Sequence, residues 1–79
     1  MNIKTQLEKL SRRELQVAMK IIDGMPNKRI ARDLFISERT VKFHCANIYR
    51  KLDISSRNIL MSTYFKEIYV KLRTDKLKR

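Results

Sequence analysis

The chain has 79 residues, enough for one small domain with little room for an enclosed substrate pocket. Its 19 Lys and Arg against 8 Asp and Glu give a formal net charge of +11. Such an excess is typical of proteins that bind DNA, RNA, an acidic protein or an anionic membrane. A single Cys and a single His exclude an internal disulfide framework and a zinc site built by one chain alone.

We expect a cytoplasmic protein for three reasons. The sequence has a single cysteine, no leader-like region after Met1 and no apolar run long enough to span a membrane. We expect residues 1–79 to form a single domain, with a core over about residues 8–72 and a frayed basic tail at 73–79. The only Gly and the only Pro, Gly24 and Pro26, share one break, and alternating strand patterns are absent. The fold class predicted is therefore all-α, a compact four-helix domain.

The first helix is predicted over residues 12–23. Ser11 and Glu14 have the spacing of a capping box, and Gly24 is placed to end the helix in a left-handed conformation. The residues expected to face inward are Leu15, Ala18, Met19 and Ile22.

A second helix is predicted over residues 28–34, with Asn27 as its N-cap, followed by a corner at residues 35–37. Its inward residues would be Ile30, Ala31 and Leu34. A third helix, over residues 38–52, begins after the N-cap Ser37. Its core face would consist of Val41, Cys45, Ile48 and Leu52.

The fourth helix is predicted over residues 56–72, with Ser55 as its cap, and carries apolar residues on more than one face. Its second stripe would be Met61, Phe65, Ile68 and Leu72. We favour a two-fold dimer contact through this stripe, because a self-complementary stripe suits a two-fold interface. The alternative is that Ile3 and Leu7 fold back and cover it.

The helix, corner and helix between Asn27 and Leu52 have the spacing of a helix-turn-helix, which places its second helix in the major groove of DNA. Among the outward residues of that recognition helix, Lys42, Phe43 and Asn47 have the chemistry to read bases, and Arg39 and Arg50 to clamp phosphates. The candidate DNA-binding residues are Lys28, Arg29, Arg39, Thr40, Lys42, Phe43, Ala46, Asn47 and Arg50. The alternative is a solvated basic face, but an exposed aromatic on such a helix favours a partner.

His44 lies on the flank of this face, where it could bond a phosphate or sense pH. The simpler interpretation, which we favour, is a histidine packed against the second helix with one ring nitrogen bonded. Cys45 is expected to be an inert core thiol.

Three blocks of sequence together resemble the LuxR-type DNA-binding domain, also called GerE- or FixJ-type, over roughly residues 10–60. They are Leu10-Ser11-Arg12-Arg13-Glu14 with Gly24, then Asn27-Lys28-Arg29-Ile30-Ala31 with Leu34, then Ile36-Ser37-Glu38-Arg39-Thr40-Val41-Lys42-Phe43-His44 with Asn47-Ile48, Lys51-Leu52 and Ser56-Arg57. The resemblance implies a four-helix fold and a bacterial transcription regulator that binds inverted or direct half-sites as a dimer. It also implies base contacts at Lys42 and Phe43.

Two positions depart from the family pattern. Ala46 stands where relatives often carry a longer polar residue, which removes one base contact, and Asp53 stands where relatives are often basic. Relatives usually carry an N-terminal receiver or ligand domain. The 79 residues of this sequence contain no such domain, so we expect a stand-alone member of the family.

The function predicted is therefore a sequence-specific DNA-binding transcription regulator associated with the bacterial nucleoid, with double-stranded DNA and a second copy as partners. Another transcription regulator and RNA polymerase are further candidate partners. Two alternatives remain open: a protein-interaction module that pairs with another regulator, and a domain resembling the promoter-reading domain of a sigma factor. We expect no enzymatic activity and no cofactor, because the sequence lacks a carboxylate pair with a pocket, a glycine-rich phosphate loop and a base beside Cys45.

Overall fold

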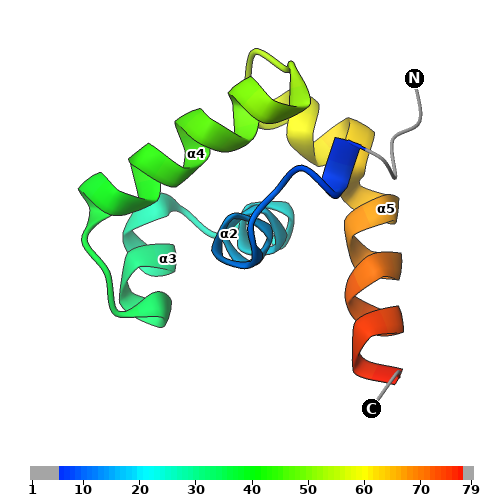
Figure 1. Cartoon of the computed structure of the whole chain (residues 1–79). Coiled ribbons are helices and arrows are strands. Elements are labelled where there is room, and N and C mark those ends of the chain that lie inside the picture. The colour runs from blue at the N-terminus through cyan, green and yellow to red at the C-terminus, as the bar shows by residue number, and fades with distance from the viewer. Residues whose placement is uncertain (1–5, 78–79) are drawn as a thin grey trace.

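The computed structural model describes the backbone of residues 6–77 and the side chains of residues 6–68. Within these residues there are no strands, and four helices follow a helical turn at Gln6 and Leu7. The helices are α2 (Arg12–Ile22), α3 (Asn27–Leu34), α4 (Glu38–Leu52) and α5 (Arg57–Leu77). Helix α2 contacts each of the other three and lies at the centre of the domain (Figure 1). The predicted all-α, four-helix architecture is confirmed.

The predicted capping box at the start of α2 is confirmed. The Ser11 Oγ accepts from the Glu14 backbone N–H at 3.1 Å, and the Glu14 Oε1 accepts from the Ser11 N–H at 2.9 Å. Two N–H groups that the helix cannot satisfy internally are therefore bonded reciprocally. Ser37 caps α4 as predicted, since its Oγ accepts from the Thr40 N–H at 3.0 Å.

Helices α2, α3 and α4 end in the same way, with one residue in the left-handed region. These residues are Gly24 (φ 87°), Phe35 (φ 58°) and Asp53 (φ 56°). After each, the next N–H donates to the carbonyl five residues back: Met25 to Lys20, Ile36 to Ala31 and Ile54 to Tyr49, at 2.9–3.1 Å. Each of these donors is a partly buried apolar residue that packs against the core. This repeated motif keeps the connections between the helices short and directs the residue after each helix end toward the core.

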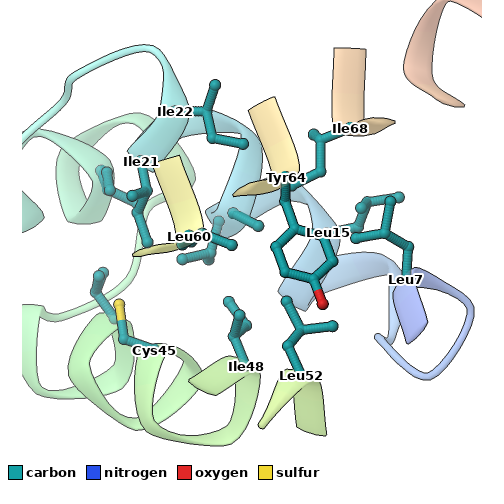
Figure 2. Packing of buried hydrophobic residues seen from close by; sticks show 14 of the residues in the cluster. Leu7, Leu15, Ile21, Ile22, Cys45, Ile48, Leu52, Leu60, Tyr64 and Ile68 are labelled. Carbon is teal, nitrogen blue, oxygen red and sulfur yellow. The ribbon is translucent and has the colours of Figure 1, made fainter. Parts of the chain in front are cut away.

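The core lies among α2, α4 and α5 (Figure 2). Helix α4 contributes the four residues predicted, and α5 contributes residues spaced by four, Leu60, Tyr64 and Ile68. On α2 the prediction is incomplete: Val17 and Ile21 are fully buried, whereas Met19 is only partly so. Because α2 is covered by three helices, its buried face is wider than a single stripe.

Four predicted boundaries are wrong by one or more residues: the end of α2, the start of α3 and both ends of α5. Helix α2 ends at Ile22, one residue before the predicted end, and Asp23 is its C-cap. Asn27 does not cap α3; it is the first helical residue after Pro26, and no side chain caps this helix. The hydroxyl at the start of α5 belongs to Ser56, which accepts from the Ile59 N–H at 3.3 Å, and not to Ser55. Helix α5 also continues to Leu77, five residues beyond the predicted end, so the basic segment from residue 73 is helical as far as that residue.

Candidate nucleic-acid interface

Helix α4 separates a buried face from a basic exposed face. Val41, Cys45, Ile48 and Leu52 are at most 6 % exposed, which fixes the rotation of the helix about its axis. The opposite face exposes Arg39, Lys42, Phe43, Ala46 and Arg50 to solvent. Phe43 is 63 % exposed, a large apolar area for a residue in a row of charged side chains. The face is therefore both cationic and able to make an apolar contact.

Two of the candidate residues on α4 are partly buried and hydrogen-bonded to neighbours. The Arg50 Nη2 donates to the Asn47 Oδ1 at 3.1 Å, which occupies one acceptor site of the amide and leaves its NH₂ group to donate. The Thr40 Oγ1 and the Ser37 Oγ lie 2.9 Å apart, so that one hydroxyl donates to the other and Thr40 is held at the N-terminal end of the face. Both contacts order side chains that would otherwise rotate freely.

The N-terminus of α3 supplies a second basic point. Lys28 and Arg29 are exposed in its first turn, and this turn has no acidic residue and no side-chain cap. The first two N–H groups, of Asn27 and Lys28, can therefore donate to a bound anion, as the N-terminus of a helix commonly does. Pro26 occupies the N-cap position and has no side-chain acceptor, and the Oδ1 of the following Asn27 accepts from the Arg57 Nη1 at 2.9 Å.

A partly buried ion pair holds α4 against α2. The Lys51 Nζ lies 2.7 Å from the Glu14 Oε1, and the Glu14 side chain is only 7 % exposed. Burial alone would raise the pKa of Glu14, but the bonds from Lys51 and Ser11 and the charge of Lys51 outweigh it and lower that pKa. The carboxylate therefore stays ionised, and one oxygen joins the capping box of α2 to the last turn of α4.

His44 and Cys45 occupy the boundary between the basic face and the core. The Nδ1 of His44 is buried without a hydrogen-bond partner, so the expectation of a bonded ring nitrogen is not met at this atom. Cys45 is core as predicted, and burial raises its thiol pKa, against the opposing charge of Arg57 and a bond with Tyr49.

Helix α5 meets the predicted dimer stripe only in part. Ile68 is fully buried in the core of the single chain, in register with Leu60 and Tyr64, so its assignment to an exposed stripe is wrong. Phe65 is 50 % exposed and Met61 is partly buried, whereas the Leu72 side chain lies outside the described residues. Leu7, which the alternative prediction placed over this stripe, is 2 % exposed and belongs to the core, but Phe65 stays half-exposed, and Ile3 lies outside the described residues. Packing also begins before residue 8, where the core was predicted to start.

Several residues of this region were missed from the sequence. Phe35, at the corner between α3 and α4, is 93 % exposed, and Ile59 on α5 is 37 % exposed. The roles of Arg57 and Lys51 depend on contacts to residues 30 and 37 positions away, so no local pattern could have found them.

Within the part of the chain that the structure describes, none of the helices has both the length and the hydropathy of a membrane span.

Comparison with known proteins agrees with this geometry. Residues 8–63 match the family described as GerE, bacterial regulatory proteins of the luxR family. The chain is 44% identical over 61 residues to a nitrate/nitrite response regulator protein homolog of Haemophilus influenzae, a match that covers 77% of the chain and 29% of that protein. It is 47% identical over 55 residues to the transcriptional regulatory protein FixJ of Rhizobium meliloti, with 70% of the chain and 27% of FixJ covered.

A third relative is the transcriptional regulatory protein LiaR of Bacillus subtilis, 48% identical over 50 residues, which are 63% of the chain and 24% of LiaR. The matched region thus spans less than a third of each of these relatives. No solved structure matches the chain. The family match covers most of the chain, including every helix that carries the basic face. The chain therefore belongs to the luxR family of bacterial regulatory proteins, as a DNA-binding helix-turn-helix domain.

Proposed function

We propose that the chain binds double-stranded DNA at specific sequences by placing α4 in the major groove, and that it regulates bacterial transcription in this way. The observation that carries the proposal is the two-faced α4. Four buried residues and the Glu14–Lys51 pair lock one side, while the other exposes five of the nine predicted DNA-binding residues. A rigid, oriented helix with a basic outer face is what major-groove reading requires.

The side chains divide by chemistry. Lys42 donates to guanine O6 and N7, and Phe43 lies against a thymine methyl group. Arg39 and Arg50 contact phosphates near the two edges of the groove, with Thr40 beside Arg39. Because the Asn47 Oδ1 already accepts from Arg50, its NH₂ group is the part that reaches the DNA. Ala46 leaves room on the face without a polar contact of its own.

A second anchor comes from α3. Lys28 and Arg29 bring two positive charges to an uncapped helix N-terminus, which together suit one phosphate of the DNA backbone. This anchor carries no sequence information and would set the register of α4 in the groove. DNA binding of this kind would place the protein in the bacterial cytoplasm, at the nucleoid.

We propose further that two copies pair through α5. With Ile68 assigned to the core, the described part of the stripe is Met61 and Phe65, four residues apart on one side of the helix; the side chain of Leu72, the last predicted member, lies outside the described residues. The half-exposed Phe65 is its centre. Sedimentation should show association that depends on concentration, and Phe65→Ser should weaken it, whereas Lys66→Ser at the next exposed position should not. A wild-type chain that stays monomeric at high concentration and on its DNA site would contradict the pairing.

The primary experiment selects bound duplexes from a random library at near-physiological salt. A repeated half-site with centres about one helical turn apart is the expected result. On the enriched duplex, Lys42→Ala should cost about 1–3 kcal/mol and relax the preference at one base pair, whereas Arg50→Ala should weaken all sequences alike and flatten the salt dependence. Lys9→Ala, an exposed lysine outside the face, is the control.

Two results would change the conclusion. Equal loss of specific and random binding in Lys42→Ala would remove Lys42 from the base-reading set. Binding without any enriched motif would favour a module that pairs with another regulator.

A further inference from the structure

Arg57, the first residue of α5, holds the segment that leads into α3. Its Nη1 donates to the Asn27 Oδ1 at 2.9 Å, and its Nη2 donates to the Met25 carbonyl oxygen. Met25 lies in the loop before Pro26 and Asn27 is the first residue of α3, so one guanidinium fixes the chain on both sides of the proline. The planar fork of Arg, with donors in fixed directions, suits two acceptors of this kind.

The position is unfavourable for α5 considered alone. A cation in the first turn lies at the positive end of the helix dipole, and the Arg57 side chain is partly buried, so it loses part of its hydration. Its charge also lies close enough to Cys45 and Tyr49 to lower the pKa of both, against the larger raising effect of burial. The interactions that offset these costs are therefore the hydrogen bonds of Arg57 with the α2–α3 loop and with α3.

That contact fixes the position of the α3 N-terminus. The N-cap position of α3 is Pro26, which has no side-chain acceptor, and the N–H groups of Arg29 and Ile30 already donate to the Pro26 carbonyl oxygen. The N–H groups of Asn27 and Lys28 have no partner within the helix and lie next to the exposed Lys28 and Arg29 side chains, on the segment that Arg57 holds. These are the groups that would contact phosphate in the proposed complex.

We propose that Arg57 is a positioning residue for DNA binding: it orients the N-terminus of α3, and with it Lys28 and Arg29, toward a DNA phosphate without touching the DNA itself. This inference rests on the proposed function. It predicts that Arg57 affects the affinity for every sequence and not the choice of sequence, because α4 has its own anchors on α2.

The test is Arg57→Lys, which keeps the charge and removes the fork. Affinity is measured by fluorescence anisotropy over a salt series, on the enriched duplex and on a duplex of random sequence. Both affinities should fall about tenfold with their ratio unchanged, and the slope of log K against log salt should fall by about one, as for the loss of one phosphate contact. Circular dichroism establishes that each variant is folded at the assay temperature.

A double-mutant cycle separates positioning from general stability. If Arg57 acts through the α3 N-terminus, Arg57→Lys should cost less than about twofold once Lys28 is replaced by Ala, because the contact that it positions is already gone. Asn27→Ala removes one of the two acceptors and keeps Arg57, so it should lower the affinity for DNA in the same way but by a smaller factor. Arg13→Lys is the matched control, since Arg13 is exposed and bonds only Gln16, on its own helix, at 3.3 Å.

Three outcomes would overturn the inference. Wild-type affinity and slope in Arg57→Lys would show that the fork has no role. Weak binding in Arg57→Ala with full binding in Arg57→Lys would show that the charge contacts DNA directly. Additive losses with Lys28→Ala would leave a structural role only. A wild-type chain that binds no duplex at all would instead refute the proposed function, and this role with it.

Discussion

Glu14→Gln tests how much the ion pair between α2 and α4 contributes to stability. The change keeps the shape of the side chain and an oxygen that can accept from the Ser11 N–H, but removes the charge that faces the Lys51 Nζ at 2.7 Å. The capping box is thus largely preserved, and the measured loss reports on the interaction between the helices.

The magnitude follows from the geometry. A hydrogen bond to a charged group contributes about 1.5–3 kcal/mol and a neutral one about 0.5–1.5 kcal/mol, so the difference is about 1–2 kcal/mol. Lys51 retains 29% of its side-chain exposure and can recover part of its hydration, which favours the lower half of that range. A loss of about 1 kcal/mol would lower the melting temperature of a domain of this size by roughly 4–8 °C.

The assay is urea unfolding followed by circular dichroism, at one low protein concentration so that any association does not contribute. Glu8→Gln, the same change at an exposed glutamate, is the control and should alter the free energy of unfolding by less than about 0.5 kcal/mol. Lys51→Met and the double variant with Glu14→Gln complete a double-mutant cycle. We expect the two residues to be coupled by about 1 kcal/mol in the free energy of unfolding.

The pH dependence has a definite sign. The folded pKa of Glu14 is lowered from its ordinary value of 4.5, so the ionised carboxylate stabilises the fold above that value and the contribution disappears as the pH falls through the lowered folded pKa. The difference between wild type and Glu14→Gln should therefore be constant near neutral pH and shrink in acid. A difference near zero at neutral pH, or one that does not shrink in acid, would refute the reasoning.

Three further predictions concern single residues. Phe35→Gly should raise the free energy of unfolding by about 0.5–1 kcal/mol in the same urea assay, because Phe35 is 93 % exposed and its left-handed conformation is strained for any residue with a Cβ; a loss would show that the ring packs in solution. Gly24→Ala should lower it by about 1 kcal/mol, since a Cβ there meets nothing within 4 Å and only the positive φ opposes it; no change would show that the corner relaxes. Cys45 should react with a thiol reagent at least about a hundredfold more slowly than free cysteine, and urea should remove the protection, because burial raises the thiol pKa and blocks access; rapid labelling of the folded chain would contradict the buried assignment.

Local features of this protein were predictable because their causes lie within a few residues. The bounds of α4 and its four core residues follow from the Ser37 cap and from helical spacing. The capping box at Ser11 and Glu14 and the left-handed Gly24 depend on the same short range. The exposed basic face of α4 then follows as the complement of its buried face, and with it most of the candidate DNA-binding set.

Which apolar residues of α5 are core was decided by packing. Ile68 and Phe65 are equally apolar in the sequence, but only Ile68 lies in register with Leu60 and Tyr64 against α2, and Leu7 closes the core beside them (Figure 2). Helix ends show the same limit: Gly24 predicts its own left-handed turn, whereas Phe35 adopts one because the following Ile36 packs against the core.

Contacts between distant residues were decided only by the tertiary structure. Glu14 could be assigned to a cap from the sequence, but its bond to Lys51 spans 37 residues. Asn27 has the sequence signature of a cap, yet it is the first helical residue after Pro26, and its side-chain oxygen accepts from Arg57, 30 residues away. The sequence by itself therefore determined which helices form and which face of α4 is basic, because those depend on spacing and caps. The tertiary structure decided how firmly that face is held and which N-terminus stands beside it, because those depend on bonds between helices that only folding brings together.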